Sequence, residues 1–262
     1  MSQPIRAKKH LGQHFLCDEH IAKKIVDAVL EKDRLTPLIE IGPGTGVLTK
    51  YLINEFPQFL ALDIDRESVD YLQNLYPDKK DQIKFSDFLE EDLKTFFPDK
   101  FNVIGNFPYN ISSQIMFRVL EHRHDVNIVV GMFQKEVAQR LAEKPGTKTY
   151  GILSVLLQAF YNIEYLFTVH EHVFSPPPRV KSAVIRLERN ATIKLNCNEE
   201  LFFKVVKTTF NQRRKQIRNS IRPLYFSETV IHPLFEKRPE QLSVPQFEEL
   251  TRFVEENAEG RK

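Results

Sequence analysis

The fold is decided by the stretch Leu38-Ile39-Glu40-Ile41, which runs directly into Gly42-Pro43-Gly44-Thr45-Gly46. The first four residues are mostly apolar and predict a short buried strand. The glycines allow the backbone to turn tightly and to approach a ligand closely. An apolar pattern over residues 47–52 then predicts a helix, whose N-terminal N–H groups are free to bind. A strand, a glycine turn and a helix in this order indicate an α/β protein with a ligand cleft.

The spacing of the glycines helps to distinguish which class of nucleotide ligand this turn can bind. A dinucleotide-binding turn has the sequence Gly-x-Gly-x-x-Gly, with an acidic residue about 20 positions further on. Here the third glycine comes one position early, and Pro43 separates the first two. The turn also lacks the Gly-Lys-Ser/Thr sequence that cradles a triphosphate. The sequence therefore favours a nucleoside-sized ligand, and a dinucleotide-dependent oxidoreductase is a weaker alternative.

Strand and helix patterns alternate along the chain around this stretch. Short apolar runs predict further strands at residues 59–62, 83–85, 101–104 and 127–130. A closing strand pair is expected at residues 161–169 and 182–187, with no convincing helix between them. This order predicts a mostly parallel sheet with helices on both faces and an antiparallel hairpin at one edge.

The pattern changes after Glu188, where the chain becomes helical in period and is punctuated by prolines. We therefore expect a domain boundary near residue 190. Residues 1–16 predict a basic arm ahead of the first helix. The expected organisation is an α/β domain with this arm at residues 1–190 and a small all-α domain at residues 191–262.

The composition is that of an ordinary globular protein. Of its 262 residues, 42% are hydrophobic and 27% are charged, and the net charge is +2. Cys17 and Cys197 lack metal-ligand spacing, as do His10 and His14, so we expect neither a disulfide nor a metal site. No secretory signal follows the basic N-terminus, and no apolar run reaches the roughly 18–20 residues of a membrane span. We expect a cytoplasmic protein without membrane contact and, since no long heptad run is present, a monomer.

Aspartates follow two of the predicted strands at the point where each strand ends. Asp63 could accept hydrogen bonds from both hydroxyls of a ribose, and Asp87 from the amino group of an adenine. Ligands bind at the carboxyl ends of strands in open α/β sheets. Either aspartate alone is more often a helix N-cap, but together with the glycine turn they predict a site for ribose and adenine. A ligand of this kind with no required phosphate contact suits S-adenosylmethionine.

The turn Asn106-Phe107-Pro108-Tyr109 follows the predicted strand at residues 101–104. The Asn106 amide oxygen and the Phe107 carbonyl, which Pro108 keeps in an extended segment, can accept hydrogen bonds from an exocyclic amine. Tyr109 offers a flat face on which a base can stack. The alternative is a strand–turn–helix junction with a capping Asn and a packed Tyr. If the turn holds an adenine, methyl transfer to its neutral nitrogen needs alignment and a polar cradle, with no strong base or metal.

Phe174 begins the proline-rich segment 174–179, which we expect to be a loop. Enzymes that act on a base in nucleic acid take it out of the stack, and the Tyr109 and Phe174 rings could then sandwich it. Because the chain has 21 Phe, ordinary core packing of Phe174 is an equal alternative.

A basic cluster in the C-terminal region indicates contact with nucleic acid. It consists of Arg213, Arg214, Lys215, Arg218 and Arg222. At helical spacing, Arg214, Arg218 and Arg222 are expected near one face. We expect further basic contacts from Lys8, Lys9, Arg179, Lys181 and Arg186. Phosphate contacts of this kind give affinity without reading sequence, although a charge run is often only a solvated face.

Together these stretches resemble the ribosomal RNA adenine dimethyltransferases. On the cofactor side the matching blocks are Gly12-Gln13-His14-Phe15-Leu16, residues 40–46, residues 62–65 and Asp87. On the substrate side they are residues 106–112, 133–140 and 174–182. The blocks occur in the family's order over residues 8–220, and residues 210–219 are similar to the branch that acts on small-subunit RNA.

The resemblance implies a Rossmann-like methyltransferase sheet and S-adenosylmethionine as cofactor. It implies dimethylation, at N6, of two adjacent adenosines in the 3′-terminal hairpin of 16S ribosomal RNA, within immature 30S subunits. Residues 191–262 would then be an RNA-binding domain. Carried over by position, the cofactor contacts are His14, Leu16, Gly42, Asp63, Asp87 and Asn106. The catalytic set would be Asn106, Phe107, Pro108, Tyr109 and Phe174.

Three positions depart from the family's pattern. His14 stands where Asn is usual, Asp63 where Glu is commoner, and Phe107 where Leu is usual. Two alternatives stay open on the same fold: a 23S ribosomal RNA adenine methyltransferase of the macrolide-resistance type, and a non-enzymatic ribosome-assembly factor.

Overall fold

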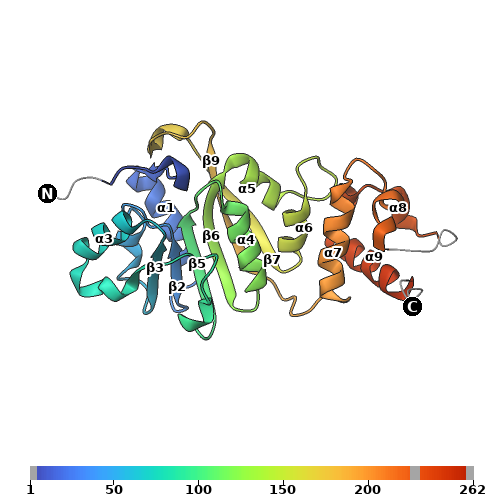
Figure 1. Cartoon of the computed structure of the whole chain (residues 1–262), viewed down its shortest axis with the longest axis horizontal. Coiled ribbons are helices and arrows are strands. Elements are labelled where there is room, and N and C mark those ends of the chain that lie inside the picture. Colours follow the sequence, from blue (N-terminus) through green and yellow to red (C-terminus); the bar gives the residue numbers. More distant parts are fainter. Residues whose placement is uncertain (1–4, 225–230, 258–262) are drawn as a thin grey trace. The chain divides into compact units, whose positions relative to one another are not determined.

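A computed structural model describes residues 5–224 and 231–257. Within them, a seven-stranded sheet has the strand order β4-β3-β2-β5-β6-β9-β7 (Figure 1). Its strands are β2 (Leu38–Ile41), β3 (Phe59–Asp63), β4 (Ile83–Phe85), β5 (Phe101–Asn106), β6 (Val126–Gln134), β7 (Tyr161–Val169) and β9 (Ser182–Arg189). β2 to β6 pair in parallel, whereas β9 is antiparallel to β6. The expected mostly parallel sheet with an antiparallel pair at one edge is confirmed.

In the sheet, β6 pairs with β9, and β7, which follows β6 in the sequence, does not lie next to it. The antiparallel register pairs Gln134 with Ser182 and Ile128 with Glu188, and β7 lies outside β9 at the edge. Because β9 starts opposite the carboxyl end of β6, the segment between β7 and β9 must return to that end of the sheet. In α/β sheets this is the end at which ligands bind.

Helices accompany the strands where the apolar periodicity predicts them. They are α1 (Glu19–Leu30), α2 (Thr49–Leu52), α3 (Arg66–Leu75), α4 (Ser112–Glu121), α5 (Lys135–Ala142), α6 (Ile152–Gln158), α7 (Glu199–Asn211), α8 (Ile217–Ser220) and α9 (Val244–Asn257). Short 3₁₀ turns occur at Lys9–Leu11, Pro77–Gln82, Leu93–Thr95, Glu171–Val173, Arg222–Leu224, Pro233–Glu236 and Pro239–Gln241. α1 begins after Asp18, whose side chain accepts a hydrogen bond from the Ile21 N–H at 3.0 Å. α2 is shorter than expected, since the glycine turn extends to Leu48.

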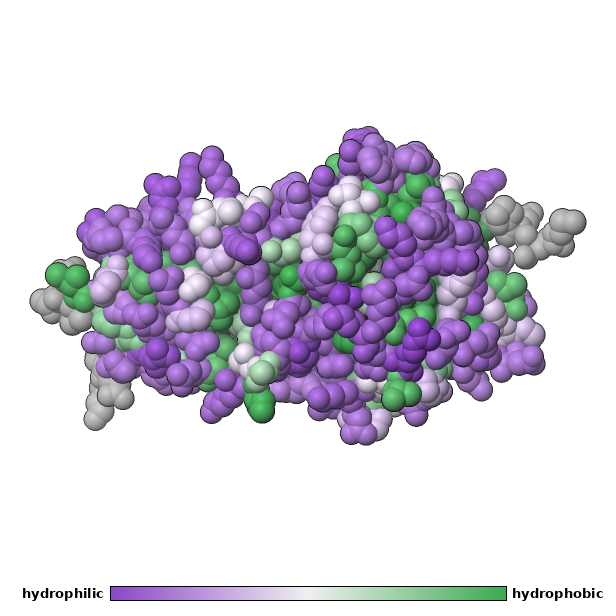
Figure 2. Space-filling view, turned by 180° about the vertical axis from the view of Figure 1, so that it is seen from behind, coloured by the Kyte–Doolittle hydropathy of each residue, from purple (hydrophilic) through white to green (hydrophobic). Residues whose placement is uncertain are grey.

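Alternate residues of the strands pack into different layers. Ile104, Val130 and Met132 belong to the buried cluster that also contains the apolar stripe of α1. Val103 and Val129, which are equally buried, point to the other side because successive side chains of a strand face opposite ways. Hydrophilic residues cover most of the molecular face drawn in Figure 2. None of the described helices is both long and apolar enough to cross a membrane.

A two-stranded sheet attaches the N-terminal arm to the proline-rich segment. β1 (Phe15–Leu16) pairs antiparallel with β8 (Phe174–Ser175), and the Cys17 N–H donates to the Val173 carbonyl at 2.8 Å. The arm and the segment before β9 are therefore held together, although they are far apart in the sequence.

The described residues group into two compact units. One holds the chain up to residue 138 together with 163–189, and the other holds 139–162 together with the chain from 190 on. In the second unit the Tyr150 and Phe210 rings lie 6.5 Å apart, and the Gly146 N–H donates to the Glu240 carbonyl at 2.7 Å. The chain passes from the first unit to the second at residue 190, where the boundary is expected. The second unit also contains α6, which precedes that boundary in the sequence. The sequence did not indicate this, because strand–helix alternation continues through residues 139–162; the domain limits at 190 stay a prediction.

Candidate functional site

A cavity lies where β2, β3 and β5 end, and we call it the strand-end cavity. Its lining comes from the arm (Leu11–Phe15), from Gly42 and Gly44, from Asp63 and Ile64, and from residues 106–111. All of these belong to the first compact unit. The structure thus brings together most of the residues predicted from the sequence: His14, Gly42, Asp63, Asn106, Phe107, Pro108 and Tyr109.

The glycine turn passes close to the arm. Gly44 has φ +54°, in the left-handed region that side chains disfavour, and a Cβ there would lie 2.8 Å from the Phe15 ring. The Gly44 N–H donates to Oδ2 of Asp63 at 3.2 Å. Glycine is needed at this position for both the backbone conformation and the approach of Phe15.

Asp63 is oriented by two backbone donors. Its Oδ1 accepts from the Asp65 N–H at 2.8 Å, and its Oδ2 accepts from Gly44. Burial raises the pKa of Asp63 to about 6, so the carboxylate is still mostly ionised at neutral pH. An ionised carboxylate offers about four lone-pair positions. The carboxylate therefore keeps lone-pair capacity that suits the hydroxyls of a ribose.

Glu40 belongs to the cofactor block at residues 40–46, but sequence reasoning assigned it no role; it does not line the cavity and acts on Asp63 through its charge state. It lies in β2, is only 1% exposed, and accepts a hydrogen bond from the Thr49 hydroxyl at 2.8 Å. Burial, with a smaller contribution from the charge of Asp63, raises the pKa of Glu40 to about 8. The side chain is therefore protonated at neutral pH and places no second charge beside Asp63. The available signal was a single acidic residue inside an otherwise apolar strand.

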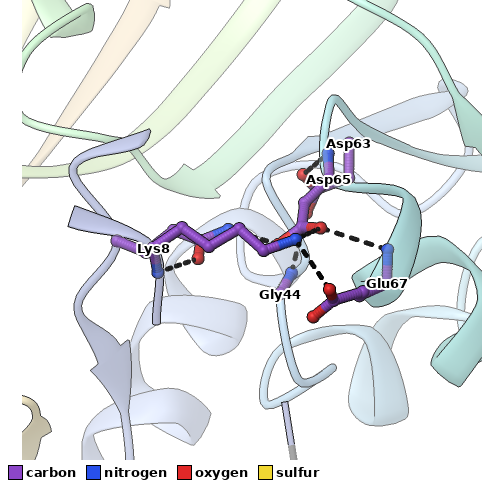
Figure 3. A network of polar contacts seen from close by, with 6 residues as sticks. Lys8, Gly44, Asp63, Asp65 and Glu67 are labelled. Carbon is purple, nitrogen blue, oxygen red and sulfur yellow. Dashed lines mark hydrogen bonds and ion pairs between the residues drawn. The ribbon is translucent and has the colours of Figure 1, made fainter. Parts of the chain in front are cut away.

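The arm is fastened to the end of β3 by Asp65 (Figure 3). Asp65 accepts from the Lys8 ammonium at 2.7 Å, from the Gln13 amide at 3.0 Å and from the Glu67 N–H at 3.1 Å. Burial raises the pKa of Asp65, but the hydrogen bonds from Lys8 and Gln13 outweigh it and hold the pKa below its ordinary value. Lys8, predicted to contact nucleic acid, has its charge engaged inside the protein here.

The turn at Asn106 and Phe107 has two oxygen atoms that accept no hydrogen bond from the described residues. The Asn106 amide nitrogen donates to the His14 carbonyl at 2.9 Å. Because a carbonyl can only accept, the nitrogen must face it and Oδ1 must point away. The Phe107 N–H donates to the Met132 carbonyl at 3.2 Å. Among the described residues, none donates to Oδ1 of Asn106 or to the Phe107 carbonyl.

The Phe107 ring anchors this turn in the core. It is 1% exposed and meets the Phe133 ring edge-on, with ring centroids 5.2 Å apart. The ring covers Gly131, where a Cβ would lie 2.3 Å from it. Gly131 in β6 therefore makes room for a phenylalanine at the position where the resembling family usually has leucine. Gly131 carried no such signal in the sequence, since its contact with Phe107 depends on strand pairing.

Tyr109 is held by two neighbours. Its hydroxyl is hydrogen-bonded to the Ser182 hydroxyl, and its ring stacks on the His14 imidazole with centroids 5.5 Å apart. Burial raises the pKa of Tyr109, so the phenol stays protonated. Nδ1 of His14 lies 2.8 Å from the Pro176 carbonyl and must carry the proton of that hydrogen bond. His14 thus connects the arm, Tyr109 and the proline-rich segment.

Comparison with known proteins decides the family. The sequence model described as ribosomal RNA adenine dimethylase matches residues 5–254. The chain belongs to this family. It is 55% identical over 254 residues to Ribosomal RNA small subunit methyltransferase A of Cytophaga hutchinsonii, covering 96% of this chain and 98% of that protein. The protein of the same name from Porphyromonas gingivalis is 51% identical, with 96% and 99% covered.

Solved structures show the same fold. A dimethyladenosine transferase from Plasmodium falciparum superposes with a TM-score of 0.73 at 24% identity, covering 92% of this chain and 97% of that one. The 23S rRNA methyltransferase ErmE superposes with a TM-score of 0.66 at 24% identity, covering 92% and 99%. The Rossmann-like methyltransferase fold, the family and an S-adenosylmethionine-dependent ribosomal RNA adenine dimethyltransferase activity, all expected from the motifs, are confirmed.

Three predicted site residues lie away from the strand-end cavity of this dimethylase. Leu16 and Phe174 face each other in the β1–β8 pair and are 2% and 4% exposed, inside the hydrophobic core. The expectation that Phe174 lies in a loop is wrong, because the segment pairs with the arm. Asp87 accepts from the Leu89 N–H at 2.9 Å, as in a turn. The contacts of these three with ligands stay predictions.

The C-terminal basic residues do not share one helix face, so that expectation is wrong. α7 ends at Asn211 and α8 begins only at Ile217, because Gln216 is extended. Arg213 donates to the carbonyls of Thr147 and Lys148, and Arg218 pairs with Glu236 at 3.0 Å. Of the five basic residues in this cluster, Arg214, Lys215 and Arg222 have no side-chain partner among the described residues.

Arg186 is not a surface contact for nucleic acid. Its side chain is 8% exposed and binds Glu164 at 2.6 Å and the Ala28 carbonyl at 3.1 Å. It holds β9 to its neighbours instead. The described residues hold no group of three or more His, Cys, Asp or Glu side chains arranged for a metal ion.

Proposed function

We propose that this dimethylase transfers methyl groups from S-adenosylmethionine to N6 of two adjacent adenosines in the 3′-terminal hairpin of 16S ribosomal RNA, within immature 30S subunits. The observation that carries the proposal is the pair of free acceptors at the cavity wall, Asn106 Oδ1 and the Phe107 carbonyl. Two acceptors suit the two N–H groups of an adenine amine. The names of relatives that are 51–55% identical support the small subunit as the source of the RNA.

The residues of the strand-end cavity fit S-adenosylmethionine. The ionised Asp63 has lone pairs for both ribose hydroxyls, and the glycine turn allows close approach of the ligand. When bound, the cofactor supplies an electrophilic methyl group on a sulfonium. Glu40, protonated beside Asp63, leaves a single carboxylate at the ribose position.

The chain's own contribution is alignment. Asn106 is neutral and adds no charge beside a sulfonium, while its bond to the His14 carbonyl fixes the direction of Oδ1. Pro108 stiffens the turn, and Phe107 anchors it under Gly131. Tyr109 supplies the stacking face, and Phe174 would have to leave the core to supply the other. Proximity and orientation of this kind can lower a barrier by about 7–11 kcal/mol.

RNA contacts are proposed for the basic residues that stay free. In the first unit these are Lys9 and Arg179, and in the second they are Arg214, Lys215 and Arg222. Lys8, Arg213 and Arg218, also predicted to bind RNA, would have to exchange their present partners. We further propose that the enzyme acts in the cytoplasm as a monomer.

The test compares two substrates. Purified enzyme and tritiated S-adenosylmethionine are incubated with 30S particles from cells that lack this modification, and with free 23S RNA. We expect four methyl groups per 30S particle, carried on two dimethyladenosines in nucleoside mass mapping, and none on 23S RNA. Methylation of 23S RNA would favour the macrolide-resistance alternative. Binding of S-adenosylhomocysteine in calorimetry without transfer to either RNA would favour an assembly factor.

A further inference from the structure

A second cavity adjoins the strand-end cavity, between the arm and the proline-rich segment. Its volume is about 560 Å³. This lies within the range of about 300–1,000 Å³ that ligand sites occupy. Its walls include Lys9 of the arm, Gln134 at the end of β6, and residues 176–180. No function is yet assigned to it, and all of its lining lies in the first compact unit.

The two cavities share a wall. Gly12, Gln13, His14 and Tyr109 line both of them. The stacked rings of His14 and Tyr109 therefore stand at the boundary. A base held against Tyr109 in the strand-end cavity would have its covalent neighbour within reach of the second cavity.

The charge of the second cavity suits a phosphate. Lys9 and Arg179 line it, both are exposed, and neither has a side-chain partner in the part of the chain that the structure describes. No acidic residue is among its lining residues. The neighbouring Lys8, by contrast, is bound to Asp65. Adjacent lysines of the arm therefore serve different cavities, and the free one faces the second.

Gln134 gives this cavity a group that can read a base. It ends β6, where its backbone pairs with Ser182, and its side chain is half-buried. Its amide has no partner among the described residues. A carboxamide offers two donors and an acceptor, which match the edge of an adenine. Pro176, Pro177 and Pro178 also line this cavity and give it a stiff apolar wall.

We propose that the second cavity binds the nucleotide adjacent to the adenosine being methylated. Its phosphate contacts Lys9 and Arg179, and its base contacts the Gln134 amide. The inference rests on the proposed function, in which the neighbour is also an adenosine. It makes Gln134 a specificity residue that requires an adenine beside the target.

The experiment uses the full-length enzyme, its Gln134→Ala variant, and two kinds of reconstituted 30S particle. One particle carries the natural adenosine pair, and in the other the neighbour of the target adenosine is uridine. On the natural pair we expect Gln134→Ala to reduce kcat/KM about tenfold, as for the loss of a hydrogen-bonded base contact. On the uridine particle, wild type and variant should be equally slow, because the contact is already lost. Affinity for S-adenosylhomocysteine should not change, since Gln134 does not line the strand-end cavity.

An equal loss on both particles would overturn the proposal, because Gln134 would then act without the neighbouring base. Wild type that modifies neither particle would refute the proposed function instead, so the two failures are distinguishable.

A second measurement tests the proposed contact of Lys9 and Arg179 with the phosphate. Lys9→Met with Arg179→Met should reduce the salt dependence of RNA binding by about one phosphate contact, a change of roughly 0.7–0.9 in the log–log slope. The exposed Lys100→Met variant is the control, and an unchanged slope in the double variant would count against the site.

Discussion

The Lys8 ammonium lies 2.7 Å from Oδ1 of Asp65, a carboxylate with a completely buried side chain. The N–H of Asp65 in turn donates to Asp63, the proposed ribose acceptor, at 2.8 Å. The fastening of the arm and the orientation of Asp63 therefore depend on one residue. This arrangement connects attachment of the arm with the orientation of the Asp63 carboxylate.

Lys8→Met should weaken cofactor binding. Loss of the ammonium leaves Asp65 without its charged partner and loosens residues 11–15, which line the strand-end cavity. We expect a rise in Kd for S-adenosylhomocysteine of roughly two- to fivefold, since a partly exposed ion pair is screened by water. Calorimetry measures it, with Lys9→Met as the matched control. If both variants bind the cofactor as wild type does, the arm is not held by Lys8.

Asn106→Ala should abolish turnover and largely spare cofactor binding. The variant loses Oδ1 and the bond to the His14 carbonyl, so the amine is no longer oriented. A loss of about 10²–10³ in kcat is expected, comparable with removal of one positioned transition-state hydrogen bond in other enzymes. Asn106→Asp is the matched variant: it keeps the size but introduces charge and loses the donor, and we expect it to be slow too. Full tritium transfer to 30S particles by either variant would refute this role.

Gly131→Ala should displace the Phe107 ring, because the new Cβ would lie 2.3 Å from it. We expect destabilisation of about 1–3 kcal/mol, as for overpacking of a core, and a loss of activity because the Phe107 carbonyl moves with the ring. The double variant Gly131→Ala/Phe107→Leu should recover part of the activity, since leucine removes the contact at 2.3 Å, whereas the Phe133 ring at 2.7 Å from the new Cβ still has to shift. Thermal unfolding and transfer rates measure both effects.

Gly151→Ala provides the control for Gly131→Ala, because a Cβ at Gly151 would have its nearest contact at an ordinary 3.7 Å. A Gly131→Ala protein as active as this control would show that the turn tolerates the shift. A double variant no more active than Gly131→Ala would mean that the Phe133 ring, 2.7 Å from the new Cβ, couples Gly131 to the site rather than the Phe107 ring.

Stability should fall as pH rises, through Glu40. Its pKa is raised from 4.5 to about 8, so between these values the folded chain holds a proton that the unfolded chain has lost. The free energy of unfolding therefore decreases with pH in this window, by at most about 1.4 kcal/mol per pH unit from this group. Glu40→Gln still accepts from Thr49 but cannot titrate. Urea unfolding at pH 5–9 should show a flatter profile for the variant; parallel profiles would contradict the assignment.

Local patterns were enough to predict much of this site. The apolar run 38–41, the glycine turn after it and the Asn106 turn each depend on neighbours in sequence, through strand periodicity and backbone restrictions. In an α/β sheet the ends of parallel strands meet, so Asp63 and Asn106 were expected together, and the structure places both in one cavity.

What the sequence alone determined is therefore the strand–turn–helix order, the family and the residues at the strand ends. Only the tertiary structure decided which groups are already engaged: Lys8 with Asp65, 57 residues away, and Asn106 with the His14 carbonyl, 92 residues away. It also decided that β9 inserts beside β6, which brings residues 176–180 to the second cavity and buries Phe174. The physical reason is that burial and pairing are set by strand order across the sheet, and no periodicity within a segment records that order.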